Sequence, residues 1–268
     1  MNHKKIGEVI LDVKDISLSF GGVNALTDIS FDVREHEVRA IIGPNGAGKS
    51  SMLNCINGVY TPQKGTISFR SKTFDHMDSH EVATMGIART FQNLALFKGM
   101  SVIDNLMTGR NLRIKSNLFS QAFRNPFNLW GMGGAEKEEI KHREFVEHII
   151  DFLEIQAYRK TPVGQLPYGL QKRVDLGRAL SMEPQVLLLD EPMAGMNLEE
   201  KQDMCRFVLD INDEFGTTVV LIEHDMGVVM DISDRVVVLD YGKKIGDGTP
   251  EAVRQNPDVI SAYLGTSH

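Results

Sequence analysis

The sequence predicts an α/β fold in which a buried parallel sheet is the central element. Residues 186–189 and 218–222 are short, almost entirely apolar runs, and each is followed by a segment with helical periodicity, residues 198–215 and 226–232. Apolar runs followed by helices are typical of strands that are buried on both faces of a parallel sheet. A further strand is expected at residues 38–42, where another short apolar run precedes a glycine-rich stretch.

An antiparallel lobe is expected at the start of the chain. Residues 10–20 and 25–33 alternate apolar and polar side chains, and Gly21 and Gly22 lie between them. Such alternation is typical of half-buried strands, and paired glycines favour a tight turn. We therefore expect two antiparallel strands here.

An inserted helical lobe is expected in the middle of the chain. No strand pattern is visible between about residues 81 and 165, and helical periodicity dominates residues 102–112 and 135–153. Further along, residues 236–240 and 244–246 predict two strands around a Tyr-Gly turn, and a helix is expected to end near Leu264.

The composition argues against several classes of function. The formal net charge of the 268 residues is −7, so no overall electrostatic attraction to nucleic acid is expected. Cys55 and Cys205 form no CxxC pair, which disfavours a zinc site and favours a reducing compartment. No apolar run approaches the roughly 20 residues of a membrane-spanning helix. The first residues also lack the long apolar stretch of a secretory signal.

A phosphate-binding motif is the strongest functional signal. Residues 43–50 read GPNGAGKS and match G-x-x-x-x-G-K-[ST] between a predicted strand and a helix predicted at residues 49–57. Glycines let the backbone approach phosphate groups, which a helix N-terminus also favours. We expect Lys49 to reach the β- and γ-phosphates and Ser50 to bind Mg²⁺. The residues expected to contact the nucleotide here are Gly43, Pro44, Asn45, Gly46, Ala47, Gly48, Lys49, Ser50 and Ser51.

An acidic pair, Asp190 and Glu191, directly follows one of the predicted buried strands. Beside a phosphate-binding loop, Asp190 could hold the Mg²⁺ shell. Glu191 could orient or deprotonate a water beyond the γ-phosphate, as a general base. Such a pair alone is often only a solvated turn, but next to the phosphate motif it predicts nucleotide hydrolysis.

With its motifs in this order, the sequence resembles the ATP-binding-cassette (ABC) superfamily over essentially the whole chain. The resemblance implies one domain over residues 1–268, with a RecA-like P-loop NTPase core, an N-terminal antiparallel β-subdomain and an inserted α-helical subdomain. The expected parts are core and β-lobe at 9–92 and 165–240, helical subdomain at 93–164, and C-terminal extension at 241–268.

The resemblance also implies further site residues. Gln92, in RTFQN, looks like the Q-loop glutamine that contacts Mg²⁺ or water, and His224 looks like the switch histidine that contacts the γ-phosphate. Phe20 looks like the aromatic that stacks on adenine, although a strand Phe is by default a core residue. The expected catalytic residues are Lys49, Gln92, Glu191 and His224, and the expected Mg²⁺ ligands are Ser50, Gln92 and Asp190.

Two family motifs are degenerate in this chain. LPYGLQKR aligns with the signature LSGGQ, from which Pro167, Tyr168 and Leu170 depart. Gly169 is retained before a predicted helix, so backbone and dipole contacts with ATP could survive where the serine hydroxyl is missing. In AGMN, Asn197 stands where the family D-loop usually has aspartate.

The resemblance implies a head-to-tail dimer, of two copies or with a second ABC ATPase, in which ATP lies between the P-loop of one subunit and the signature helix of the other. Hydrolysis would reopen this dimer and move attached transmembrane permease subunits, with a substrate-binding receptor acting indirectly. The chain would be a peripheral subunit at the cytoplasmic face of the inner (plasma) membrane, with ATP and Mg²⁺ as cofactors and no nucleic-acid partner.

The form LPYG, the opening FGG and the closing NPDVISAYLG resemble the ATP-binding subunits of branched-chain amino acid importers. Importers of urea or other small amides and the lipopolysaccharide-export ATPase are alternatives. ABC ATPases without transport usually carry long coiled coils or two cassettes, and neither is visible here. A P-loop kinase or small GTPase leaves Gln92, the LPYG segment and His224 unexplained. A non-hydrolysing regulatory cassette is disfavoured by four intact residues, Lys49, Asp190, Glu191 and His224.

Residues 110–130 carry basic and aromatic side chains and no acidic one. Two interpretations stay open: contact with a permease or with the headgroup region of a membrane, or a surface loop whose aromatics pack on the helical lobe. The side chains concerned are Arg110, Arg113, Lys115, Phe119, Phe123, Arg124, Phe127 and Trp130.

Overall fold

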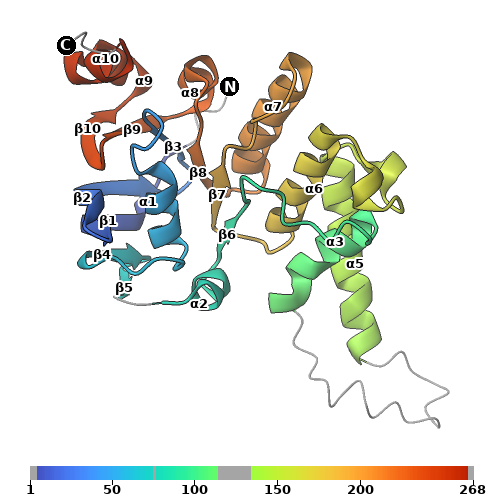
Figure 1. Cartoon of the computed structure of the whole chain (residues 1–268). Helices are drawn as coiled ribbons and strands as arrows, with labels where there is room; N and C mark the ends of the chain where they lie inside the picture. The colour runs from blue at the N-terminus through green and yellow to red at the C-terminus, as the bar shows by residue number, and fades with distance from the viewer. Residues whose placement is uncertain (1–4, 75–76, 114–133, 265–268) are drawn as a thin grey trace, which may run out of the picture. The chain divides into compact units, whose positions relative to one another are not determined.

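The chain divides into two compact units (Figure 1). One unit combines residues 1–92 with residues 185–268, and the other comprises residues 93–184. The residues that the computed structural model describes are 5–74, 77–113 and 134–264.

The first unit contains an antiparallel sheet in the order β2-β1-β4-β5. Its strands are β1 (Val9–Phe20), β2 (Val23–Arg34), β4 (Lys64–Phe69) and β5 (Lys72–Phe74). Gly21 and Gly22 form the β1–β2 turn with φ angles of 53° and 89°, which glycine adopts readily. The expected antiparallel β-subdomain is therefore confirmed.

A second sheet in the same unit has the order β10-β9-β3-β8-β7-β6. Its strands are β3 (Val38–Ile42), β6 (Ile87–Arg89), β7 (Val186–Asp190), β8 (Thr218–Ile222), β9 (Arg235–Asp240) and β10 (Lys243–Gly248). Every residue of β3, β7 and β8 is buried, and neighbouring strands from β9 to β6 run parallel. The expected α/β class is confirmed, because buried strands of this kind need cover on both faces.

Strand β6 lies in the region where no strand pattern was visible, so that expectation was wrong at this point. β6 pairs in parallel with β7, with Ile87 opposite Val186. Three residues are too few to show periodicity in the sequence, and the pairing with a long-range partner decides their conformation.

Helices follow the strands of the parallel sheet in the first unit (Figure 1). They are α1 (Lys49–Ile56), α2 (Ser79–Thr84), α7 (Leu198–Glu214), α8 (Met226–Ile232), α9 (Pro250–Gln255) and α10 (Pro257–Leu264). Because β3, β8 and β7 are neighbours and parallel, the loops after them lie along one edge of the sheet. That edge is where ligands bind in open α/β sheets.

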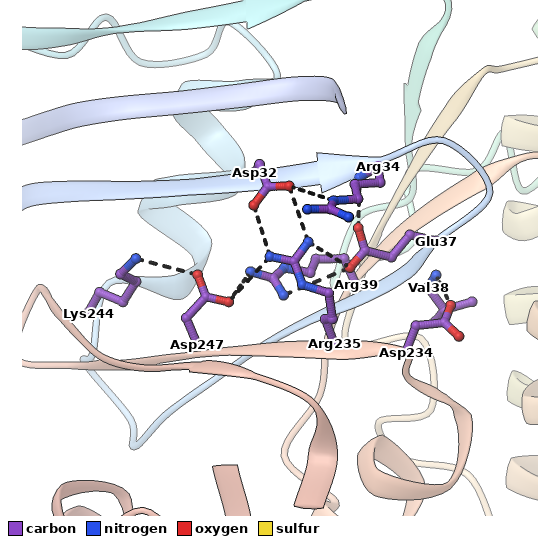
Figure 2. A network of polar contacts seen from close by, with 9 residues as sticks. All are labelled: Asp32, Arg34, Glu37, Val38, Arg39, Asp234, Arg235, Lys244 and Asp247. Carbon is purple, nitrogen blue, oxygen red and sulfur yellow. Dashed lines mark hydrogen bonds and ion pairs between the residues drawn. The ribbon is translucent and has the colours of Figure 1, made fainter. Parts of the chain in front are cut away.

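A network of charged side chains connects the two sheets (Figure 2). Asp32 on β2 accepts hydrogen bonds of 2.9 and 3.2 Å from Arg235 on β9, and these hydrogen bonds lower the pKa of Asp32 to about 2. Arg39 on β3 is fully buried and donates to Asp247 on β10. Glu37 lies 3.4 Å from Arg235 and 3.8 Å from Arg39, and burial raises its pKa.

The second unit is helical. Its elements are α3 (Val102–Thr108), a 3-10 turn η1 (Gly109–Leu112), α5 (Gly134–Phe152), short 3-10 turns at Gln156–Tyr158 and Val163–Gln165, and α6 (Tyr168–Leu180). A Cβ on Gly177 of α6 would lie 2.8 Å from Leu153, directly after α5, and 3.2 Å from Leu106 of α3. The helix α6 therefore packs closely against α3 and the end of α5 at Gly177. Because α6 packs here, this unit ends at residue 184, whereas the helical subdomain was expected to end at residue 164.

Two arginines of the basic and aromatic segment serve the second unit itself. Arg110 is 4% exposed, donates to His142 Nδ1 and to the carbonyl of Ser181, and forms a 2.6 Å ion pair with Glu183. Arg113 donates to the carbonyls of Met182 and Glu183. These two side chains therefore do not support the permease or headgroup interpretation, and Lys115 to Trp130 lie outside the described residues.

Candidate functional site

The P-loop joins β3 to α1 and surrounds a cavity of about 240 Å³. A Cβ on Gly43 would lie 2.0 Å from the carbonyl oxygen of Leu239, and one on Gly48 would lie 2.6 Å from that of Ala25. Glycine is thus required at both positions, because the loop approaches β9 and β2 closely. The residues that line the cavity are Ala25, Asn45, Gly46, Ala47, Gly48, Lys49, Ser50, Ser51, Glu191 and His224.

Lys49 is held on the loop by two carbonyl groups. Its Nζ donates to Gly43 O at 2.8 Å and to Pro44 O at 2.9 Å. Burial lowers the pKa of Lys49 below its ordinary value, and the charges of Glu191 and Asp190 offset only part of this effect. An ammonium group has three donors, so the two loop contacts leave a third proton that can be donated to a phosphate oxygen.

Glu191 lies between two other predicted catalytic residues. Its Oε2 accepts a 2.8 Å hydrogen bond from Gln92 Nε2, and its Oε1 lies 2.6 Å from His224 Nε2. The backbone of Glu191 has a φ of 50°, which is uncommon for a residue other than glycine and is often found at functional sites. The structure therefore brings Glu191, Gln92 and His224 together, with Glu191 and His224 at the phosphate cavity.

Asp190 is 4% exposed and is bound by an arginine that no sequence motif indicated. Arg89, at the end of β6, donates to Asp190 Oδ2 at 2.8 Å and to Asn54 Oδ1 of α1 at 2.6 Å. A charged residue at the end of the short apolar run that precedes Gln92 was the available signal. Arg89 thereby ties the strand leading to Gln92 to both α1 and the acidic pair.

The predicted Mg²⁺ ligands fit a site completed by phosphate. Asp190 Oδ1 is buried and has no hydrogen-bond partner in the part of the chain that the structure describes, and Ser50 lies in the first turn of α1 at the cavity. Among the described residues there is no group of three His, Cys, Asp or Glu side chains that could hold a metal ion. Mg²⁺ commonly uses one or two protein oxygens together with water and substrate phosphates, so this sparse set is suitable.

Glu223 is a second residue of this region that no sequence motif indicated. It is 4% exposed and accepts hydrogen bonds from the backbone N–H groups of Met193 and His224. Burial raises its pKa. Glu223 thus joins the loop after β8 to the loop after β7, and its position directly before His224 was the signal in the sequence.

The lining of the cavity does not include the predicted residues Gly43, Pro44, Gln92 and Asp190, and three further residues that the sequence motifs indicated are also not part of it. Phe20 is at the tip of the β1–β2 hairpin and is 46% exposed. Gly169 lies in the second unit, within the first turn of α6 rather than before the helix. Asn197 caps α7, because its side chain accepts from the N–H of Glu200. Asparagine and aspartate are both good N-cap residues, so α7 keeps its N-cap although Asn197 replaces the usual aspartate.

The fold and the site define a P-loop nucleotide-binding protein with an α/β core. Residues 26–194 match a family model described as ABC transporter, and residues 243–268 match one described as branched-chain amino acid ATP-binding cassette transporter. The chain belongs to the ABC transporter family, as an ATP-binding ABC ATPase subunit.

Curated ATP-binding proteins of transporters are similar to nearly the whole of this chain. The high-affinity branched-chain amino acid transport ATP-binding protein BraF of Pseudomonas aeruginosa is 37% identical over 96% of this chain and 98% of its own. The corresponding LivG of Escherichia coli is 36% identical over 97% and 99%. A sulfate/thiosulfate import ATP-binding protein, CysA of Bacillus cereus, is 34% identical over 92% of this chain but only 63% of its own.

Solved structures agree with this assignment. A nucleotide-free ATP-binding cassette from an ABC transporter has a TM-score of 0.80 at 29% identity and covers 96% of this chain. A cassette in its ADP conformation has the same TM-score and identity. In the described part of the chain, no helix is both long and apolar enough to cross a membrane.

Proposed function

We propose that this ABC ATPase drives the import of branched-chain amino acids through separate permease subunits, as a translocase. The observation that carries the hydrolytic part is the placement of Glu191, between Gln92 and His224, at the edge of the P-loop cavity. The amino acid cargo is supported by the names of the relatives BraF and LivG and by the match of residues 243–268.

In this proposal each site residue has a defined task. The backbone of residues 43–51 and Lys49 bind the phosphates of ATP, and Phe20 stacks on adenine. Ser50, Gln92 and Asp190 hold Mg²⁺, which neutralises charge on the β- and γ-phosphates. Glu191 accepts a proton from the attacking water, and His224 orients Glu191 and contacts the γ-phosphate.

The proposed assembly is a head-to-tail dimer, with a second copy or with a sister ABC ATPase. Gly169, in the first turn of α6, would present backbone N–H groups to the γ-phosphate bound by the other subunit, because a helix N-terminus favours anions. The dimer would lie peripherally at the cytoplasmic face of the inner membrane, attached to transmembrane permeases and acting indirectly with a substrate-binding receptor.

Glu191→Gln tests the proposed base. We expect ATP hydrolysis to fall at least about 100-fold, because an amide cannot accept the proton of water, while ATP binding persists and an ATP-bound dimer accumulates. Steady-state hydrolysis and sedimentation with ATP measure both effects. The matched control is Glu199→Gln, an exposed glutamate in the first turn of α7, which should keep normal turnover. Unchanged turnover in Glu191→Gln contradicts the assignment.

Purification of the tagged chain from mild detergent extracts tests the transport role. We expect multi-span permeases, a second cassette and an amino-acid-binding receptor among the proteins that copurify. A receptor specific for urea or another amide, or a lipopolysaccharide-export partner, would reassign the cargo. Chromosomal or ribosomal partners without permeases would remove transport and leave the ATPase intact.

A further inference from the structure

The exposed aromatic at the hairpin tip has an aromatic neighbour from another part of the chain. The rings of Phe20 and Tyr60 have centroids 5.0 Å apart and planes at 69°, a T-shaped contact. Tyr60 is partly buried against the hydrophobic core, whereas Phe20 is 46% exposed. Since Phe20 remains 46% exposed beside this neighbour, a large part of its surface is accessible to a planar ligand.

The backbone directly before Phe20 is bonded to the loop between α1 and β4, residues 57–63, which also contains Tyr60. Gln63 Oε1 accepts a 2.8 Å hydrogen bond from Ser19 N, and Gln63 Nε2 donates to Ser19 O at 3.2 Å. The backbone N–H of Gln63 also donates to Ser17 O at 2.9 Å. The amide of Gln63 therefore satisfies both backbone groups of Ser19, which leaves the end of β1 little freedom to move.

This loop is continuous with the phosphate-binding helix. The backbone N–H groups of Val59 and Tyr60 both donate to the carbonyl of Asn54 in α1, at 2.8 and 3.1 Å. On the other side of the hairpin, Ala25 of β2 lines the phosphate cavity. The backbone of Tyr60, whose ring contacts Phe20, is thus bonded to α1, and the hairpin that carries Phe20 continues into β2, where Ala25 lines the cavity.

We propose that Tyr60 and Gln63 are positioning residues for adenine, which hold the Phe20 ring with one face presented to the base of bound ATP. The inference rests on the proposed function, because it requires Phe20 to stack on adenine. An aromatic ring at a hairpin tip would otherwise lose rotamer freedom when the base binds, and a ring that is already fixed avoids that cost. Tyr60 and Gln63 should therefore strengthen the binding of the adenine base and leave the binding of the phosphates unchanged.

Tyr60→Ala in the purified full chain tests the inference. We expect the Kd for ATP and for ADP to rise about three- to tenfold, which is the range of an aromatic pair contact. The Kd for inorganic tripolyphosphate should not change, and the KM for ATP should rise without loss of kcat. Tyr60→Phe keeps the aromatic ring and should bind ATP with the same Kd as the unmodified chain. Calorimetric titration measures the binding constants.

A double-mutant cycle separates positioning from general destabilisation. In a Phe20→Ala background, Tyr60→Ala should cause no further loss of ATP affinity, because the ring that Tyr60 positions is gone. Gln63→Ala should act in the same direction as Tyr60→Ala. Val59→Ala, an exposed neighbour in the same loop, is the matched control and should leave ATP affinity unchanged.

The possible failures are distinguishable. If Phe20→Ala weakens ATP binding but Tyr60→Ala does not, the positioning role is overturned and the adenine site stands. If Tyr60→Ala weakens tripolyphosphate as much as ATP, the contact is only structural and the inference is overturned. If Phe20→Ala leaves ATP affinity unchanged, the proposed adenine contact fails and the inference fails with it.

Discussion

At the scale of single residues, both oxygens of the Glu191 carboxylate have a partner within the chain. Gln92 and His224 each contact one of its oxygens. A general base must have an oxygen within hydrogen-bond reach of the attacking water. Each carboxylate oxygen can accept a second hydrogen bond, so Glu191 can receive the attacking water while Gln92 and His224 keep their contacts. We therefore expect hydrolysis to depend on the positions of the loops after β6 and β8, which carry these two side chains.

Arg89 gives a prediction on stability at the same scale. We expect Arg89→Ala to lower the free energy of unfolding by about 3 kcal/mol or more, because it leaves the buried Asp190 without its charged partner. The control is Lys14→Ala, which removes an exposed partner of Asp12 and should change stability little. Urea unfolding of the purified chain measures both. Equal, small effects of the two variants would show that the Arg89–Asp190 pair does not contribute to stability.

At the scale of elements, the charged network of Figure 2 joins β2 to strands of the second sheet. The participating side chains come from β2, the β2–β3 turn, β3, β9 and β10. Burial raises the pKa of Glu37, whereas hydrogen bonds from Arg235 lower that of Asp32. Asp32 is therefore the acid of this network whose ionisation favours the folded state.

Asp32→Asn tests this contribution through pH. The folded pKa of Asp32 is about 2, below its ordinary value of 3.8, so its stabilisation is complete above pH 3.8 and is lost as pH falls towards 2. At pH 6 we expect the free energy of unfolding of the unmodified chain to be about 1 kcal/mol higher than that of Asp32→Asn, because solvent screens part of the interaction. Urea titrations between pH 6 and pH 3 should show this difference shrinking below pH 4, and a difference independent of pH would contradict the linkage.

At the scale of the whole molecule, the chain is built of two units whose proposed tasks differ. The first unit contains the P-loop, Asp190, Glu191 and His224, and the second contains Gly169 in the first turn of α6. If the dimer is head-to-tail, each ATP-binding site is completed by the second unit of the other subunit. Binding of ATP by one chain and its hydrolysis by the dimer are then separable properties.

Gly169→Asp should separate these properties. A carboxylate at a helix N-terminus suits the helix but repels the γ-phosphate of the other subunit, so we expect normal ATP binding and loss of ATP-dependent dimers in a Glu191→Gln background. Gly99→Asp is the control for an added carboxylate in the same unit, because Gly99 is exposed and a Cβ there meets no atom within 4 Å, whereas Gly169 is buried. Sedimentation with ATP measures the dimer, thermal unfolding verifies the fold, and persistent dimers in Gly169→Asp would contradict the proposed geometry.

The sequence by itself determined the α/β class, the antiparallel lobe and the P-loop, because strand alternation, apolar runs and the motif at residues 43–50 are local patterns. Only the tertiary structure decided which distant side chains meet. It placed Arg89 on Asp190, Tyr60 beside Phe20, and Arg110 on His142 within the helical unit. The physical reason is that these pairs depend on strand order and helix packing, which bring together residues far apart in the chain without any fixed spacing between them.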